Sequence, residues 1–309
     1  MKHQDTLLRF SFDHLDIRGE LVYLDQSWAL ILERYPYPGT VRKHLGEALA
    51  AITLLSASVK FEGTMILQIQ GKGPLRSVVT QITHTGSLRG IAKWHGDVPD
   101  GTLQDIYGDG QMLITVIKNS GERYQSIVEL KGESLTDALN SYFIQSEQLP
   151  ANFQLYVSDT QIAGLFLQVL PQSKVKPMQE TQVVFHDNDS LNLRDRVEDW
   201  NRISILAATL QEAEIFSLTP ERLLTNLFHV EQVRLFTPKL LHFACTCSRT
   251  KVENTLITMG RTELENILRD EGLIKVDCEF CNTHYEFSQQ DVDQLGFEPI
   301  ELKPDTVLH

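Results

Sequence analysis

The spacing of apolar residues predicts a mixture of helix and strand over the first two thirds of the chain. After a turn at Tyr37-Pro38-Gly39, the segment 41–59 repeats apolar residues every three or four positions, which is typical of a buried helix. Those residues are Leu45, Leu49, Ile52 and Leu55. Shorter apolar or alternating segments predict strands. They lie at 65–69, 78–82, 88–94, 112–117, 124–130, 153–157 and 165–170, with a second helix at 135–145. We therefore predict one α+β domain with antiparallel sheet over residues 1–179.

From about residue 180 the pattern changes to short amphipathic helices. Ile203, Leu206, Ala207 and Leu210 fall on one helical face, and Thr219-Pro220 has the form of an N-cap followed by proline at the first helical position. Helices this short are marginal in water by themselves, so their order depends on packing against a neighbouring domain. We interpret residues 180–240 as a docked helical linker.

The remaining residues, 241–309, predict a small module of two helices and a hairpin. Ser248 is suited to cap a helix that Gly260 ends, and Thr262 is suited to cap the next one. The apolar segments 274–276 and 285–287 then predict two strands of a hairpin. A module of this size has room for only a small apolar core.

All four cysteines of the chain lie in this module as two close pairs, Cys245-Thr246-Cys247 and Cys278-Glu279-Phe280-Cys281. Two pairs from separate parts of the chain supply the four thiolates of a structural zinc site, with no position left open for substrate. We therefore predict one zinc ion per chain in the reduced state, bound by these four residues. His242 and His284 are close in sequence, but four thiolates already complete the shell, so we interpret both as surface or outer groups.

Composition and charge narrow the classes of function. The chain has 309 residues and a net charge of −13, and the segment 241–309 is its most acidic part, with 13 acidic and 6 basic side chains. Such a balance disfavours nucleic acid and anionic membranes as partners. The first residues lack the apolar segment of a secretory signal, and we expect a cytoplasmic protein. Acidic surroundings also predict that the metal-free thiols are protonated and slow to react.

Four alternative interpretations compete for these cysteines and glycines. An inert zinc ribbon has the same four ligands, and a nucleic-acid-binding ribbon would need a basic surface that this segment lacks. A disulfide-exchange enzyme of thioredoxin type would need Cys278 or Cys281 at a helix N-terminus after a strand, which the sequence does not predict. Gly71-Lys72-Gly73 lacks the remaining residues of a phosphate-binding loop and is better explained as a turn. We expect no enzyme activity.

The spacing of the cysteines, with 30 residues between the two pairs, resembles the redox-regulated chaperone family of heat-shock protein 33. The resemblance extends over nearly the whole chain. It includes the segments 16–20, 71–76, 89–94, 122–125, 142–150 and 278–281.

This resemblance implies a chaperone of the bacterial cytoplasm that holds unfolding client proteins without ATP. It implies that zinc keeps the reduced form inactive, and that oxidation pairs Cys245 with Cys247 and Cys278 with Cys281, releases zinc and partly unfolds the chain. The family further implies a homodimer in the active state and transfer of clients to an ATP-dependent foldase.

The residues themselves are compatible with such a switch. Zinc would close the 30-residue interval between the pairs, whereas disulfides within each pair close only three- and four-residue loops. Structural zinc contributes roughly 10–16 kcal/mol of apparent binding free energy, which matches or exceeds the roughly 5–15 kcal/mol that stabilises a whole domain. Loss of this cross-link therefore predicts unfolding of the module and exposure of the linker's apolar residues.

Overall fold

The computed structural model describes residues 4–171 and 188–297. Its contacts divide the chain into two compact units, Met1–Ala244 and Cys245–His309. The predicted boundary between residues 179 and 180 lies outside the described residues. The three-part division into a core domain 1–179, a helical linker 180–240 and a zinc-binding module 241–309 stays a prediction.

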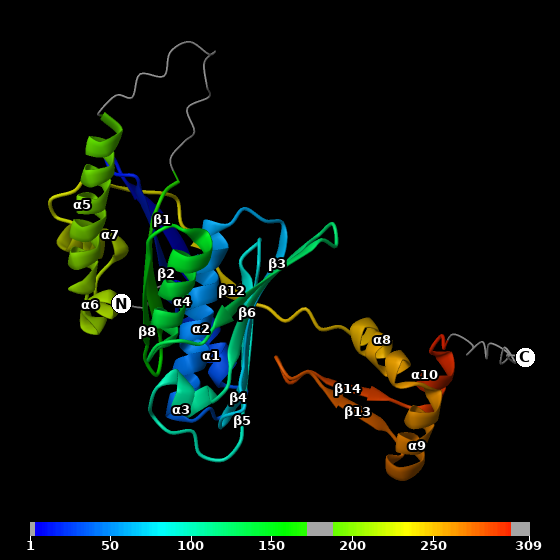
Figure 1. The fold of residues 1–309 in the computed structure, drawn as a ribbon. Helices are drawn as coiled ribbons and strands as arrows, with labels where there is room; N and C mark the ends of the chain where they lie inside the picture. Colours follow the sequence, from blue (N-terminus) through cyan, green and yellow to red (C-terminus); the bar gives the residue numbers. More distant parts are fainter. Residues whose placement is uncertain (1–3, 172–187, 298–309) are drawn as a thin grey trace, which may run out of the picture. The chain divides into compact units, whose positions relative to one another are not determined.

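The first unit contains two six-stranded sheets. The first sheet has the order β10-β1-β2-β9-β8, with β11 also paired to β1, and the second has the order β12-β5-β4-β3-β6-β7 (Figure 1). The bounds in the first sheet are β1 Thr6–Phe12, β2 Ile17–Leu24, β8 Ala151–Val157, β9 Ile162–Val169, β10 Val233–Leu235 and β11 Lys239–Leu240. Those in the second are β3 Gly63–Gln70, β4 Leu75–Thr83, β5 Ser87–Trp94, β6 Gln111–Lys118, β7 Arg123–Glu129 and β12 His242–Phe243.

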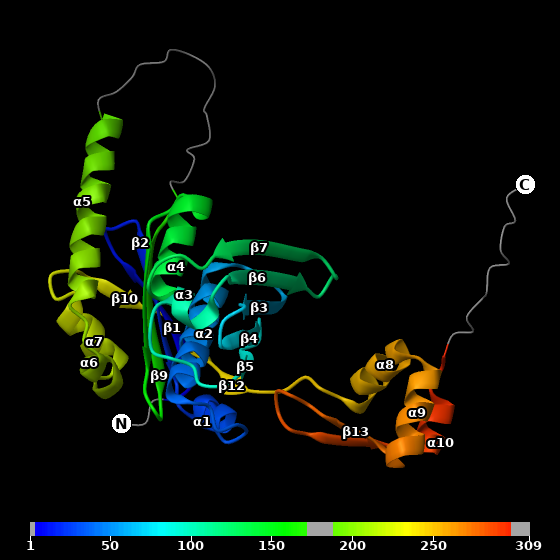
Figure 2. The ribbon, with the colours of Figure 1, turned by 60° about the horizontal axis from the view of Figure 1, so that its bottom comes forward.

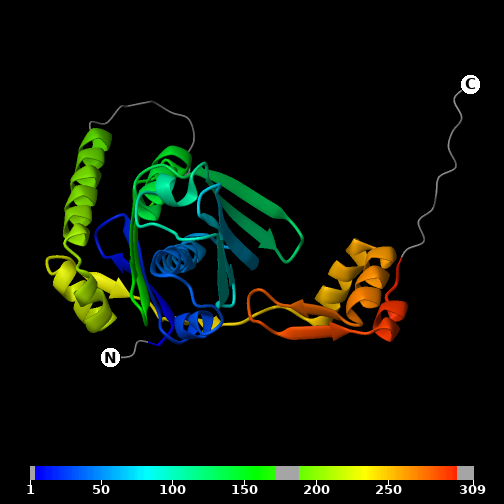
Figure 3. The ribbon, with the colours of Figure 1, turned by 90° about the horizontal axis from the view of Figure 1, so that it is seen from below.

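A long helix, α2 (Gly39–Ser58), lies between the two sheets and is the centre of the larger apolar core. Figure 3 shows it nearly end-on, with the first sheet on one side and the second sheet on the opposite side. Most of its residues are buried around its whole circumference, which explains its low amphipathicity and confirms the helix predicted at 41–59. Shorter helices surround it. They are α1 (Gln26–Leu32), α3 (Leu103–Tyr107), α4 (Leu135–Tyr142) and the π-helical turn η1 (Phe143–Glu147).

The strands predicted between residues 65 and 170 are confirmed, but the sequence did not predict β1, β2 or α1. Strands β2 and β9 are buried on both faces, because the helix α2 covers one face of their sheet and the linker helices cover the other. Where both faces are buried, apolar and polar residues no longer alternate, as at Leu21 to Leu24 of β2. This weakens the sequence pattern that predicts a strand.

Three linker helices pack on the outer face of the first sheet, where they form a second apolar core (Figure 2). They are α5 (Asn188–Ala208), α6 (Glu212–Ser217) and α7 (Pro220–Leu227). Ile203 and Ala207 of α5 are fully buried there. Phe228, after α7, packs edge-on against Phe12, with ring centroids 5.1 Å apart. The predicted cap at Thr219 is confirmed, since its hydroxyl accepts a hydrogen bond from the backbone N–H of Arg222.

The chain after the linker helices returns to both sheets through very short strands. β10 and β11 pair antiparallel with β1, and β12 pairs parallel with β5. β11 and β12 have only two residues each, and together these strands lead directly to Cys245. The sequence analysis did not predict them, because two or three residues carry no periodicity.

The second unit contains the helices α8 (Arg249–Met259), α9 (Arg261–Glu271) and α10 (Gln289–Gln294) and the hairpin β13 (Ile274–Asp277) with β14 (His284–Phe287). The predicted cap at Ser248 and the hairpin are confirmed. The predicted cap at Thr262 is wrong, because α9 begins at Arg261 with Gly260 in the N-cap position, so Thr262 lies inside the helix.

The predicted α+β class is confirmed: the structure combines sheets and helices in the first unit with a small cysteine-containing second unit. Among the described residues, none of the helices is long and apolar enough to cross a membrane.

Candidate metal centre

The four cysteine sulfurs of the second unit come together at one point. They all lie within 4.8 Å of one another, and no histidine or carboxylate belongs to this group among the described residues. Two sulfur pairs are close contacts, Cys245 with Cys278 at 3.6 Å and Cys247 with Cys281 at 3.3 Å. A tetrahedral zinc site with zinc–sulfur bonds of about 2.3 Å has sulfur–sulfur edges of about 3.8 Å. The arrangement therefore fits four thiolate ligands around a single zinc ion.

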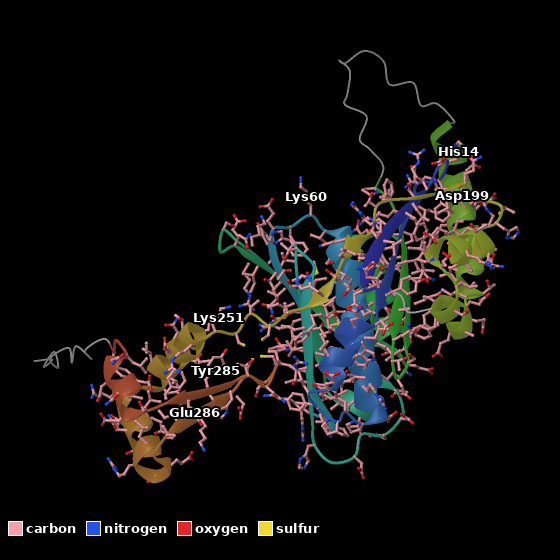
Figure 4. All side chains as sticks on the ribbon, turned by 180° about the vertical axis from the view of Figure 1, so that it is seen from behind. His14, Lys60, Asp199, Lys251, Tyr285 and Glu286 are labelled. Carbon is pink, nitrogen blue, oxygen red and sulfur yellow. The ribbon has the colours of Figure 1, made fainter. Side chains whose placement is uncertain are left out.

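The first pair of cysteines is placed by the start of helix α8. Ser248, directly after Cys247, accepts a hydrogen bond from the backbone N–H of Lys251 and so fixes where the helix begins. The ammonium group of Lys251 reaches back and donates to the carbonyl of Thr246 at 2.6 Å. These bonds order the backbone on both sides of Cys247, and Figure 4 labels Lys251 on this unit.

The second pair lies in the turn that joins β13 to β14. The backbone N–H of Cys278 donates to the carbonyl of Thr283, while the carbonyl of Cys278 accepts from the N–H groups of Cys281 and Asn282. Asn282 closes the turn with a positive φ of 54°, which asparagine tolerates better than most residues. The turn directs both thiols to the same side and thereby completes the group of four.

A small apolar core supports both cysteine pairs. Its six fully buried residues are Leu256, Leu264, Leu268, Ile274, Phe287 and Val292. The guanidinium of Arg249 lies 4.3 Å from the centre of the Phe287 ring and pairs with Asp291 at 2.6 Å. Arg261 makes a similar pair with Asp293 at 2.9 Å. These ion pairs are largely exposed, so each contributes little to stability.

Two neighbouring hydroxyl groups contact the sulfurs. Tyr285 donates a hydrogen bond to the sulfur of Cys247 at 3.2 Å, and the hydroxyl of Thr283 lies 3.1 Å from the sulfur of Cys281. Figure 4 labels Tyr285 and its neighbour Glu286, which both belong to β14. The sequence analysis missed Tyr285 and Thr283, because only the hairpin turn brings their hydroxyls to the sulfurs. The one sequence feature that points to these residues is that Thr283 follows Cys281 by two positions and Tyr285 follows it by four.

The thiols differ in acidity. Burial raises the pKa of Cys278 to about 12 and also raises that of Cys247. Burial acts in the same direction on Cys281, but hydrogen bonds from Thr283 and from the thiols of Cys247 and Cys245 outweigh it and lower the pKa of Cys281 to about 6. The prediction that all four metal-free thiols are protonated is therefore wrong for Cys281, because local hydrogen bonds override the acidic surroundings.

Neither nearby histidine belongs to the cluster. His284 contacts Asp277 at 2.6 Å and Glu286 at 3.1 Å through its two ring nitrogens, and these bonds raise its pKa. His242 lies in the first unit, where its ring contacts the hydroxyl of Ser87 at 2.9 Å. The interpretation of both residues as outer or surface groups is confirmed. All four cysteines are only partly buried, so small oxidants have access to them.

Comparison with known proteins gives a consistent result. The family model described as Hsp33 protein matches residues 5–288. A 33 kDa chaperonin of Nitrosococcus oceani is 44% identical over 309 residues and both chains are fully covered. One of Shewanella sediminis is 39% identical over 293 residues, which is 94% of this chain and 96% of the relative. The crystal structure of the 33 kDa chaperonin of Thermotoga maritima has the same fold, with a TM-score of 0.74, 23% identity and coverage of 95% and 98%.

Proposed function

The chain belongs to the Hsp33 family, and from this premise we propose that it is a redox-regulated chaperone that holds unfolding client proteins without ATP. In the reduced state Cys245, Cys247, Cys278 and Cys281 bind one zinc ion, and the protein is inactive. Oxidation of these residues unfolds the second unit and exposes apolar surface to clients. The observation that carries this proposal is the group of four sulfurs within 4.8 Å of one another, which are partly accessible to solvent.

Zinc, when bound, supplies a coordinate cross-link between two points of the chain that lie 30 residues apart. Oxidation to Cys245–Cys247 and Cys278–Cys281 removes the four thiolates that hold this link. For each disulfide, two thiolates lose two electrons in total, and one molecule of hydrogen peroxide takes them up with two protons to give two molecules of water. Each new bond closes only a short local loop, so no restraint between the two pairs remains.

The energetic balance favours unfolding of the second unit. Within its described residues the apolar core consists of six buried side chains, which is small for a folded unit. A structural zinc site contributes roughly 10–16 kcal/mol of apparent binding free energy to a fold of this size. Once the four thiolates are lost, the second unit has too little core to stay folded.

Unfolding of the second unit must then affect the linker helices. The sequence predicts that unfolding of the second unit exposes the linker's apolar residues, but α5, α6 and α7 pack on the first sheet within the first unit, so this exposure needs a further step. We propose that unfolding propagates along the chain from Cys245 through β12, β11 and β10. Strands of two or three residues open easily when their continuation is released. The loss of these strands frees one end of the linker.

The surface that would be exposed is strongly apolar. The second core buries Phe10, Leu21 and Leu165 on the sheet side, and Ile203, Leu223 and Phe228 on the helix side. Release of the helices opens both sides at once, and a contiguous apolar surface of this kind binds unfolded chains. Backbone hydrogen exchange in residues 188–244 should therefore become faster as client binding increases.

The partners follow from the same proposal. Clients are unfolding proteins, the active form is a homodimer, and clients pass to an ATP-dependent foldase in the cytoplasm. The acidic second unit, with 13 acidic and 6 basic side chains over residues 241–309, supports the absence of nucleic acid and of anionic membrane from this list of partners.

The function is tested by comparing two forms of the same protein in a light-scattering assay of a thermally aggregating client. The reduced, zinc-loaded form should allow aggregation, and the form treated with peroxide at raised temperature should suppress it without nucleotide. A parallel assay of turnover on a model disulfide tests for an oxidoreductase, which the lowered pKa of Cys281 would favour. Equal suppression by both forms, or catalytic turnover without suppression, would overturn the proposal.

The disulfide pattern gives a second test. Close sulfur contacts run between the cysteine pairs, and the thiols also interact within each pair, so proximity in the folded unit does not by itself select the local bonds. Once the thiolates no longer share a metal, chain connectivity favours the partner two or three residues away. Peptide mapping of the oxidised protein should find Cys245–Cys247 and Cys278–Cys281. A product dominated by bonds between the pairs would keep the unit cross-linked and contradict the switch.

A further inference from the structure

A hollow of about 580 Å³ in the first unit gathers positive charge in a protein whose net charge is −13. It lies beside β1, the end of α2 and the short strand β11. Its lining includes four cationic side chains, Arg9, Arg18, Lys60 and Lys239, and no aspartate or glutamate. Lys60, labelled in Figure 4, belongs to the loop that joins α2 to β3. The strands β1, β2 and β11 and the loop after α2 thus place four cations around one space.

Most of this charge is not neutralised by the protein. Within residues 4–171 and 188–297, no ion pair is formed by Arg9, Lys60 or Lys239. Lys239 instead donates to the carbonyl of His84 at 2.8 Å. Arg18 donates to the carbonyl of Ser58 at 3.1 Å and to the side-chain oxygen of Gln168 at 2.5 Å. Neutral acceptors hold these cations in place while leaving their charge uncompensated.

The nearest carboxyl group compensates this charge only partly. Glu20 faces Arg9 across the β1–β2 pair, and its carboxyl oxygen lies 3.8 Å from Arg18, which is beyond hydrogen-bond distance. Burial raises the pKa of Glu20 to about 7, despite the two arginines. Burial also lowers the pKa of Lys239, and the charge of Arg9 adds to this effect. Burial thus outweighs the two arginines at Glu20, so this carboxyl gives up part of its negative charge near neutral pH, and only the shift of Lys239 includes a contribution from neighbouring positive charge.

We propose that this hollow binds a small, multiply charged oxyanion of the phosphate type, held by Arg9, Arg18 and Lys239, with Lys60 at its rim. Guanidinium groups match the oxygen atoms of phosphate with two parallel hydrogen bonds, and lysine adds a mobile charge. A ligand with two or more negative charges would offset the repulsion between these side chains, which a single chloride would not.

Binding would have a local structural consequence. Lys239 belongs to β11, which pairs with β1 at Leu7 and Thr6, so an anion that bridges Lys239 to Arg9 and Arg18 adds a link between this two-residue strand and the body of the first unit. We expect slower hydrogen exchange over residues 233–243 when the ligand is bound. The site contains none of the cysteines, and its test does not require the proposed chaperone activity.

Titration calorimetry with sodium tripolyphosphate, in a buffer free of phosphate and sulfate, tests the site on the full-length, reduced protein. The wild type should bind one equivalent, and the Arg9→Gln/Lys239→Gln variant should bind at least about tenfold more weakly, since two charged hydrogen-bond donors to the anion are lost. The matched control is Arg222→Gln/Lys275→Gln. It removes the same charge from two exposed side chains outside the hollow and should bind like the wild type.

Several outcomes would overturn the proposal. These are no binding by the wild type, equal affinity in the Arg9→Gln/Lys239→Gln variant, or an equal loss in the control, which would indicate a general effect of net charge. Hydrogen exchange of the wild type with and without tripolyphosphate needs no variant. Unchanged exchange over residues 233–243 at saturating ligand would contradict the bridging geometry. Titration with inorganic phosphate and with sulfate then identifies which oxyanion the hollow prefers.

Discussion

The two compact units of this protein are held together by different means. The first unit has a long buried helix between two six-stranded sheets and a second apolar core under the linker helices. Within residues 245–297 the second unit has six buried apolar side chains, a few exposed ion pairs and four clustered sulfurs. The stability of the first unit is spread over many contacts that no single reaction removes. Under the proposed function, the stability of the second depends on metal coordination that oxidation removes.

This difference is what the proposed switch requires, a stable body and a part that chemistry can release. An apolar core is lost only when the unit unfolds cooperatively, and no single chemical reaction removes it. A site of four thiolates can be emptied in one chemical event, and a unit of this size has little else to keep it folded. The linker helices belong structurally to the first unit, but their chain connection leads to the second unit through β10, β11 and β12.

The largest expected effect comes from removing half of the sulfurs. Cys278→Ser/Cys281→Ser should lose zinc, unfold the second unit and suppress client aggregation without oxidant, because roughly 10–16 kcal/mol of apparent binding free energy is lost. Cys245→Ser/Cys247→Ser should behave in the same way. Metal analysis and the aggregation assay check both variants.

The matched control for these variants is Thr246→Ser, which changes the residue between two cysteines and leaves all four thiols in place. It should retain zinc and its dependence on oxidant. A zinc-free double variant that remains soluble but never suppresses aggregation, with or without peroxide, would show that the site is only structural.

A smaller effect is expected from loosening the linker without touching the cysteines. Ile203 of α5 is fully buried against the first sheet, whereas Ile205 on the same helix is 67% exposed. Ile203→Ala should weaken the docking of α5 by about 2–5 kcal/mol and give partial aggregation suppression in the reduced, zinc-loaded protein. Ile205→Ala should behave like the wild type. If Ile203→Ala lowers stability but adds no client binding, the face under α5 is not the client surface.

The smallest effect concerns the pH dependence of the first unit. The pKa of Glu20 is raised by burial to about 7, so the folded state binds more protons than the unfolded state between about pH 4.5 and pH 7, and stability falls as pH rises through this range. Relative to Glu20→Gln, the wild type should lose about 2 kcal/mol between pH 5 and pH 8. The exposed Glu33→Gln should show no such difference.

Tryptophan fluorescence during urea unfolding measures this effect, since Trp28, Trp94 and Trp200 all lie in the first unit. A parallel pH dependence in wild type and Glu20→Gln would mean that Glu20 is ionised in the folded state and paired with Arg18 after all.

The parts of the structure that the sequence could predict are those with a strong local signal. The helix α2, the strands β3 to β7 of the second sheet and the position of the cysteines follow from periodicity and spacing. Strand β2 has no clear alternation of apolar and polar residues, because successive residues such as Leu21 and Val22 face opposite cores and are both fully buried. The contacts of Tyr285 and Thr283 with the sulfurs, and the docking of Ile203 on the first sheet, depend on tertiary structure that no local pattern encodes.

Hydrogen exchange of the zinc-loaded and oxidised proteins, followed over time after addition of peroxide, tests the central claim most directly. The account predicts that protection is lost first in residues 245–297, then in 233–243 and in the linker helices, while residues 4–171 keep theirs and client binding rises with the second step. Client binding while residues 245–297 remain protected, or an even loss of protection along the whole chain, would contradict the account.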